Sequence, residues 1–329
     1  MQTSTSTLGR LVVLLLGVSL WLASSAPQAR HAGGRLRVES RDLDTGRIVS
    51  ARFYLIDSAG APRLPVGVIA YDKRDEHHFV ADGGFEIELP AGRYRLAAER
   101  GPEYLPAALG LDIQDGATRH ETVRLRRWLD MNRRGWYSGD LHNHRSVDEM
   151  PALLLAEDLN LAPTITDWIW EDRAVATPPK AAGPFRALDD HHVYSVLDKE
   201  VERLGSGPGA VALLGLRSAI PFKGYRLYPP DDVYCLRARE QRGYIDAEKI
   251  VWRDGAALAA LGLIDFVGIV HNHFNRQDVE LETDRWGMIP KSRPEFDTVA
   301  GMPLWSMDVY YHLLNCGFRL PVSAGSASG

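Results

Sequence analysis

The sequence predicts two units, a small β-sandwich followed by a β/α domain with a largely parallel sheet. Residues 33–128 alternate short β-prone runs with glycine and proline clusters, the pattern of an antiparallel sandwich. From 130 to 329, strand-like runs alternate with helical ones, which favours parallel strands joined by helices. A chain of 329 residues is long enough for both units.

Residues 1–26 have the composition of a secretory signal peptide. The apolar run LVVLLLGVSLWLA follows Arg10, is short for a membrane span, and is followed by the small residues ASSA. An uncleaved membrane anchor is the alternative. Either way, we expect the body of the protein to lie outside the cytoplasm, secreted or periplasmic.

Charge and cysteine content exclude some classes and leave others open. The net charge is −5 and no basic stripe with interleaved aromatic residues occurs, so we expect no nucleic-acid partner. Cys235 and Cys316 are the only cysteines. A disulfide between them is possible in an exported chain, but the context LLNCGF favours Cys316 as a small buried apolar residue.

The β unit has the character of an accessory module. Its segment FEIELPAGRYRLAAERG resembles the strand, turn and strand of carboxypeptidase-regulatory-like domains. Such modules usually support another domain, so attachment to a surface or a glycan is the expected role. The polar stretch RRWLDMNRRGW joins this unit to the next.

Polar residues that suit a metal ion follow the strand-like runs of the second unit. His142 and His144 come after GDL, Asp167 after TIT, and His271 and His273 after IDFVGIV. In parallel sheets, functional groups gather at the carboxyl ends of strands. Neutral imidazoles and a carboxylate suit zinc, manganese or iron, so the pattern predicts a site for one or two divalent ions. A lone HxH pair is more often a packed or exposed pair of histidines.

The second unit resembles the polymerase-and-histidinol-phosphatase (PHP) superfamily, particularly its CehA/McbA-type metallohydrolases. GWYSGDLHNHRSVDEMP is similar to the family's opening motif, and EDLNLAPTITDW, IVHNHF and VYYHLLNCGFRLPVSAGSASG extend the likeness. The resemblance implies a distorted (β/α)7 barrel with metal at its mouth, and hydrolysis of an ester, carbamate or phosphoester bond by metal-activated water.

The resemblance also implies roles for individual residues. His142, His144, His271 and His273 would be metal ligands, and Asp167 a ligand or catalytic group. Glu200 and Glu202 in DKEVER lie where the family offers a bridging or orienting carboxylate, although a solvated helix face explains them as well. His192 and His312 are further candidates, with packing roles as the alternative.

Departures from the family pattern predict a reduced site. Trp168 stands where a histidine often follows Asp167, and Ala327 and Gly329 stand where a final DxH would lie. Trp168 packs in a core or lines the pocket. The end at SAGSASG, without a closing helix, suggests a barrel truncated at its C-terminus.

Two functions remain after this reading. The first is an exported metal-dependent hydrolase of a small-molecule or glycan-like substrate, with Arg145, Arg203 or Arg217 as anion clamps. The second is a non-catalytic protein that binds a metal or a carbohydrate at a degenerate barrel site. Measuring the metal content of the purified protein would distinguish these two functions best.

Overall fold

The structure is a computed structural model. It describes residues 33–73, 76–180, 183–203, 207–225, 227–272, 289–298 and 300–328. The predicted signal peptide, His273 and Gly329 therefore lie outside the described residues.

The N-terminal unit is a sandwich of two sheets that enclose one apolar core. The first sheet contains, in spatial order, β5 (Gly84–Pro90), β1 (Gly33–Asp42), β9 (Thr118–Arg127) and β7 (Tyr104–Leu105). The second contains β3 (Ile69–Lys73), β4 (Glu76–Ala81), β2 (Ala51–Asp57), β6 (Gly92–Glu99) and β8 (Ala107–Ile113). Alternate residues point inward, so Leu36 of β1 meets Phe53 of β2 in the shared core.

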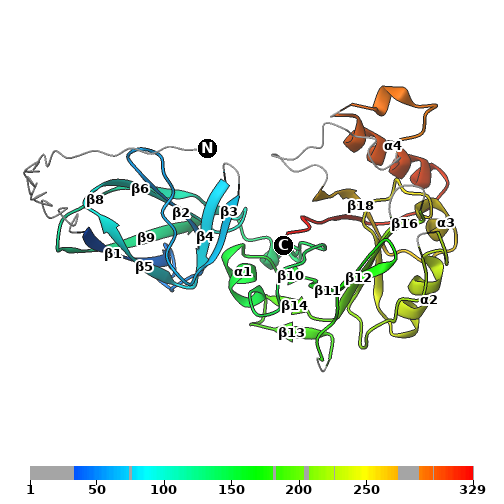
Figure 1. Ribbon diagram of the computed structural model, residues 1–329, viewed down its shortest axis with the longest axis horizontal. Helices are drawn as coiled ribbons and strands as arrows, with labels where there is room; N and C mark the ends of the chain where they lie inside the picture. Colours follow the sequence, from blue (N-terminus) through cyan, green and yellow to red (C-terminus); the bar gives the residue numbers. More distant parts are fainter. Residues whose placement is uncertain are drawn as a thin grey trace, which may run out of the picture.

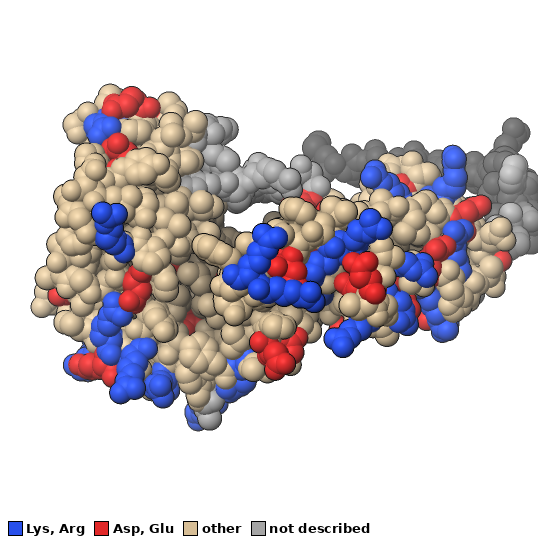
Figure 2. All heavy atoms as spheres, turned by 180° about the vertical axis from the view of Figure 1, so that it is seen from behind, with Lys and Arg blue, Asp and Glu red and all other residues tan. Residues whose placement is uncertain are grey.

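The outward faces of these strands carry paired charges. Arg35 of β1 contacts Glu86 and Glu88 of the neighbouring strand β5, at 3.1 and 2.9 Å. Lys and Arg side chains interleave with Asp and Glu side chains on the visible face of this unit (Figure 2). Because residues of opposite charge face each other across adjacent strands, these pairs stabilise the sheet, and positive and negative charges are mixed on this solvated face.

The second unit contains a seven-stranded sheet and a three-stranded one. The large sheet contains β12 (Arg173–Ala176), β11 (Ile165–Trp170), β15 (Asp198–Arg203), β16 (Gly209–Leu214), β17 (Tyr244–Ala247), β18 (Phe266–Val270) and β19 (Val322–Ala324). The small sheet contains β10 (Leu161–Ala162), β14 (Val193–Ser195) and β13 (Phe185–Ala187). The helices are α1 (Met150–Ala156), α2 (Asp232–Glu240), α3 (Gly255–Ala260) and α4 (Gly301–Asn315), with short 3-10 turns at Asn132–Arg134 and Pro294–Phe296.

The predicted (β/α)7 barrel is wrong. In the described residues the large sheet is open, with β12 and β19 as its two edges, and it is mixed because β12 and β16 run against their neighbours. Four sheets and few helices make the chain predominantly β. The segment 198–203, which could have been a solvated helix, is a fully buried strand paired directly with β16, so no helix crosses over between them.

Helices cover the large sheet and complete a second apolar core. Cys235 of α2, Leu258 of α3 and Leu313 of α4 are buried against Val211 and Val267 of the sheet. Figure 1 shows α2 and α3 side by side at the side of the second unit away from the sandwich. Cys235 and Cys316 are both free, and Cys316 is exposed, contrary to the expectation that it is buried. No helix among the described residues is long and apolar enough to cross a membrane.

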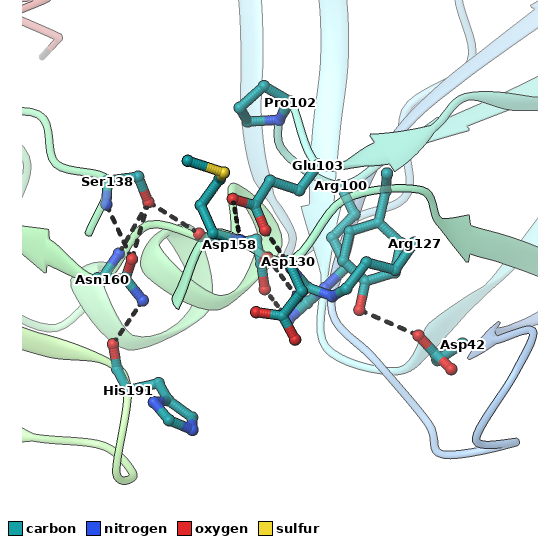
Figure 3. Close-up of polar contacts among 12 residues, drawn as sticks. Asp42, Arg100, Pro102, Glu103, Arg127, Asp130, Ser138, Asp158, Asn160 and His191 are labelled. Atoms are coloured by element: carbon teal, nitrogen blue, oxygen red, sulfur yellow. Dashed lines mark hydrogen bonds and ion pairs between the residues drawn. The ribbon is translucent and has the colours of Figure 1, made fainter. Parts of the chain in front are cut away.

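Buried charges connect the two units. Asp158, just after α1, accepts from Arg100 at 2.7 Å and from Arg127 at 2.5 Å, and both arginines belong to the sandwich side (Figure 3). Arg52 of β2 pairs with Glu157. These ion pairs hold α1 against the sandwich, and α1 also contacts β2 and β4.

Candidate metal centre

The two histidines of HNH lie on a short extended segment held by the C-terminal residues. The Leu141 amide donates to Ala324 O at 3.0 Å, the Ala327 amide to His142 O at 2.6 Å, and the His144 amide to Ser328 O at 2.7 Å. Asp140 accepts from the backbone amides of His142 and Ser326. These bonds fix both imidazoles relative to the sheet edge at β19.

His142, His144 and Glu200 converge on one point. The Nε2 atoms of His142 and His144 are 3.0 Å apart, and Glu200 Oε2 lies 3.5 Å from His142 Nε2 and 3.1 Å from His144 Nε2. One ligand atom from each residue lies within 4.8 Å of the other two. His142 and Glu200 are fully buried and His144 is partly exposed, so solvent reaches the point of convergence from the His144 side.

The donor set and its spacing fit a divalent transition-metal ion. Two ligands about 2.05 Å from a tetrahedral zinc ion are separated by about 3.3 Å, and the distances of 3.0, 3.1 and 3.5 Å bracket that value. Two imidazoles and one carboxylate suit zinc, manganese and iron alike. Three protein ligands also leave one position open for water or another molecule.

Glu248 and Lys249, immediately after β17, complete the surroundings of this cluster. Glu248 contacts His142 Nδ1, the ring nitrogen that faces away from Glu200. A carboxylate in this position fixes the orientation of an imidazole and makes its other nitrogen a better ligand. Lys249 Nζ lies 3.2 Å from Glu248, 3.5 Å from Glu202 and 3.7 Å from Glu200, so it offsets part of the negative charge.

The electrostatics of the cluster favour a bound cation. Burial alone would lower the pKa of His142, but Glu248 and Glu200 outweigh it and raise that pKa to about 10. Burial, followed by repulsion from Glu200, raises the pKa of Glu202 to about 8. Three carboxylates face a single lysine here, and this excess of negative charge attracts a proton or a metal ion.

Trp168 lies beside the cluster and also packs against the small apolar group of Ile165, Ala212 and Leu214. Its ring centroid lies 4.8 Å from that of His144, and its indole nitrogen donates to Glu202 at 3.3 Å. The side chain is only partly buried. It forms a wall on the accessible side of His144.

Asp167 points away from the histidines. In the pairing of β11 with β15, Asp167 lies opposite Lys199, whereas Trp168 lies opposite Glu200. Strand β11 continues to Trp170, so alternation sends Asp167 to the other face, where it accepts from Lys199 Nζ at 2.8 Å. The expectation that the strand ends at Asp167 fails, and with it the reason to expect a ligand there.

His271 is brought to the same edge but does not belong to the cluster, and His273 lies outside the described residues. His271 is buried and directly follows Val270, whose carbonyl accepts from the Gly325 amide beside His142. It is not a member of the three-residue group found in the described part of the chain. Of the other candidates, His192 contacts Asp189 and Asp158 at the junction of the two units, and His312 is exposed on α4.

Sequence reasoning missed Glu248 and Lys249. They follow the strand-like run YIDA in AEKIVW, and a mixed-charge pair in such a context resembles a solvated helix start. The usable signal was position: Glu248 follows a strand as His271 does, and parallel strands β17 and β18 bring their carboxyl ends to one edge.

Comparisons with known proteins identify no family for this chain. No family model matches it. No curated protein matches it either.

Solved structures similar to part of this chain include pilins. A minor pilin of Streptococcus agalactiae is 23% identical, with a TM-score of 0.24, over 30% of this chain and 45% of that one. The group B streptococcus pilus 2b backbone protein is 19% identical, with a TM-score of 0.22, over 29% and 41%. The major pilin subunit of Bacillus cereus is 16% identical, with a TM-score of 0.21, over 28% and 29%. The chain thus spans less than half the length of these structures.

The resemblance to PHP-type metallohydrolases, and the hydrolase activity it implied, are therefore corrected. No family model supports membership, and the open mixed sheet lacks the closed barrel that the family implies. What remains of the expectation is the histidine and carboxylate cluster itself.

Proposed function

We propose that this chain is an exported protein that binds one divalent transition-metal ion through His142, His144 and Glu200. The observation that carries the proposal is the convergence of two imidazole nitrogens and one carboxylate oxygen within 4.8 Å of one another. Export rests on the signal-like composition of residues 1–26.

The surroundings of the cluster support a built site. Glu248 orients His142, Lys249 balances excess charge, and Trp168 shields the accessible side. Asp167 and His271 are outside the proposed ligand set. A metal held in this way stabilises the segment 140–145 and its contact with the C-terminal residues, because binding to the folded state alone adds to stability.

Metal content of the purified full chain tests the proposal. After incubation with zinc, manganese or iron and exhaustive dialysis, we expect about one ion per chain by mass spectrometry, and a rise in melting temperature on metal addition. His144→Ala and Glu200→Gln should each abolish retention. His312→Ala removes an exposed histidine of α4 and should retain the ion. Equal metal content in all four proteins would refute the site.

A further inference from the structure

A cavity of about 410 Å³ lies between the two units. The sandwich contributes Arg52, Tyr71 and His78, and the second unit contributes Arg145 and residues of α1. Figure 1 places α1 next to β3 and β4, between the sandwich and the large sheet. The volume of the cavity lies in the range of sites that bind small molecules.

The cavity and the histidine cluster share one segment of chain. Extended backbone sends successive side chains to opposite sides. His142 and His144 meet Glu200, whereas Asn143 and Arg145 line the cavity. Asn143 is buried and its amide donates to the Pro163 carbonyl, which fixes the segment between the two sites.

Arg145 is the cation of the cavity without a local partner. Of the acidic lining residues, Glu157 pairs with Arg52, Asp140 accepts from the Ser326 amide, and Glu76 lies 3.2 Å from His78. No ion pair or hydrogen bond joins the Arg145 side chain to any described residue, although Arg145 is half-buried. Burial and then the charges of Arg52 and Arg145 lower the pKa of His78 to about 4, so the cavity wall at His78 experiences positive charge.

Part of the cavity lining is apolar. Val80 of β4 and Met150, Leu153 and Leu159 in and after α1 form this part. One guanidinium beside an aliphatic wall suits a molecule with an anionic end and an apolar end.

We infer that the cavity between the units binds a small organic anion, a carboxylate or phosphate monoester on a short apolar group, with Arg145 contacting the anionic end and Leu153 the apolar end. This site is separate from the metal cluster, since its side chains lie on the other side of residues 142–144. It is independent of the metal proposal.

Titration calorimetry on the full chain tests the inference with four probes: acetate, hexanoate, inorganic phosphate and hexyl phosphate. We expect saturable binding of hexanoate or hexyl phosphate below about 10 mM, and weaker binding of the short analogues, because each buried methylene adds about fourfold in affinity. Whichever long probe binds more tightly identifies the anionic group.

Variants assign the two ends of the ligand. Arg145→Gln should weaken the long probe at least about tenfold, since it removes a charge-assisted hydrogen bond, and should leave metal content unchanged. Leu153→Ser should weaken hexanoate but not acetate. Arg173→Gln, an exposed arginine of β12, is the matched control. Absence of saturable binding by either long probe, or wild-type affinity in Arg145→Gln with an unchanged melting temperature, would overturn the inference.

Discussion

Single residues near the cluster show which parts of the site a sequence can reveal. His142 and His144 are recognisable because a second HxH pair, His271 and His273, follows another apolar run, whereas a lone pair is more often packed or exposed. Glu200 and Glu248 are recognisable only through their positions relative to strands, because a buried glutamate and a solvated one look alike in sequence. Asp167 misleads because its face depends on where β11 ends, and that end lies at Trp170.

Trp168 provides a test at this scale. We expect Trp168→His to lose much less stability than the roughly 3–5 kcal/mol of a large core truncation, because the ring is partly exposed beside His144. The new imidazole would stand next to the metal ligands and should raise affinity for zinc or change stoichiometry.

Trp252→His is the matched comparison. Trp252 is 7% exposed in an apolar cluster with Ala210, so its replacement should incur the full core penalty without altering metal content. Melting temperature and bound metal measured on both variants decide the role of Trp168. Equal destabilisation of the two, with metal unchanged, would mean that Trp168 is a core residue.

At the scale of elements, individual strands were predictable, but their regular alternation with helices and the closure of the sheet were wrong, because β10 to β16 follow one another without a helix in the described residues. The runs TITDWIW and IDFVGIV form β11 and β18 as their apolar β-branched content predicts. Whether β15 connects to β16 by a helix or directly depends on the few residues between them, and a direct connection produced the antiparallel pair that opens the fold. Periodicity alone does not reveal that choice.

The close approach of β19 to the histidine segment depends on Gly325. A Cβ atom at Gly325 would lie 2.3 Å from His142 Cβ and 2.9 Å from its backbone nitrogen, so Gly325→Ala must displace one of the two segments. We expect at least a tenfold loss of metal affinity in that variant, measured by competition with a chelating dye.

Gly110→Ala in β8 is the control for this change, because nothing lies within 4 Å of a Cβ built there. It should keep wild-type metal affinity. Retention of full affinity in Gly325→Ala would show that the C-terminal residues do not position His142.

At the scale of the whole molecule, the two units are more tightly joined than a polar linker suggested. The sequence predicted an accessory sandwich joined to the second unit by the polar stretch RRWLDMNRRGW. The joining charges come from residues far apart in the chain, Arg52, Arg100 and Arg127 on one side and Glu157 and Asp158 on the other. Long-range pairs of this kind leave no periodic signal in a single sequence.

Asp158 tests this junction. Its carboxylate is buried between Arg100 and Arg127, so Asp158→Asn leaves Arg100 without its counter-charge and Arg127 with Glu103 alone. Removing one member of a buried ion network costs about 3 kcal/mol or more, and we expect a matching fall in the denaturation midpoint at neutral pH. Glu88→Gln, in an exposed pair with Arg35 on the sandwich surface, should leave the midpoint unchanged.

The same junction should weaken in acid. Burial alone would raise the pKa of Asp158, but its contacts with His192, Arg100 and Arg127 hold the pKa below its usual range. A carboxyl with a lowered pKa in the folded state stabilises the protein above its unfolded pKa of about 3.9, and that contribution is lost as the pH falls through the folded value. The stability difference between wild type and Asp158→Asn should therefore be full at pH 7 and shrink as the pH falls below about 4. Unfolding midpoints measured for both proteins across this range test the sign, and a difference that stays constant or grows in acid would show that the charge of Asp158 does not hold the two units together.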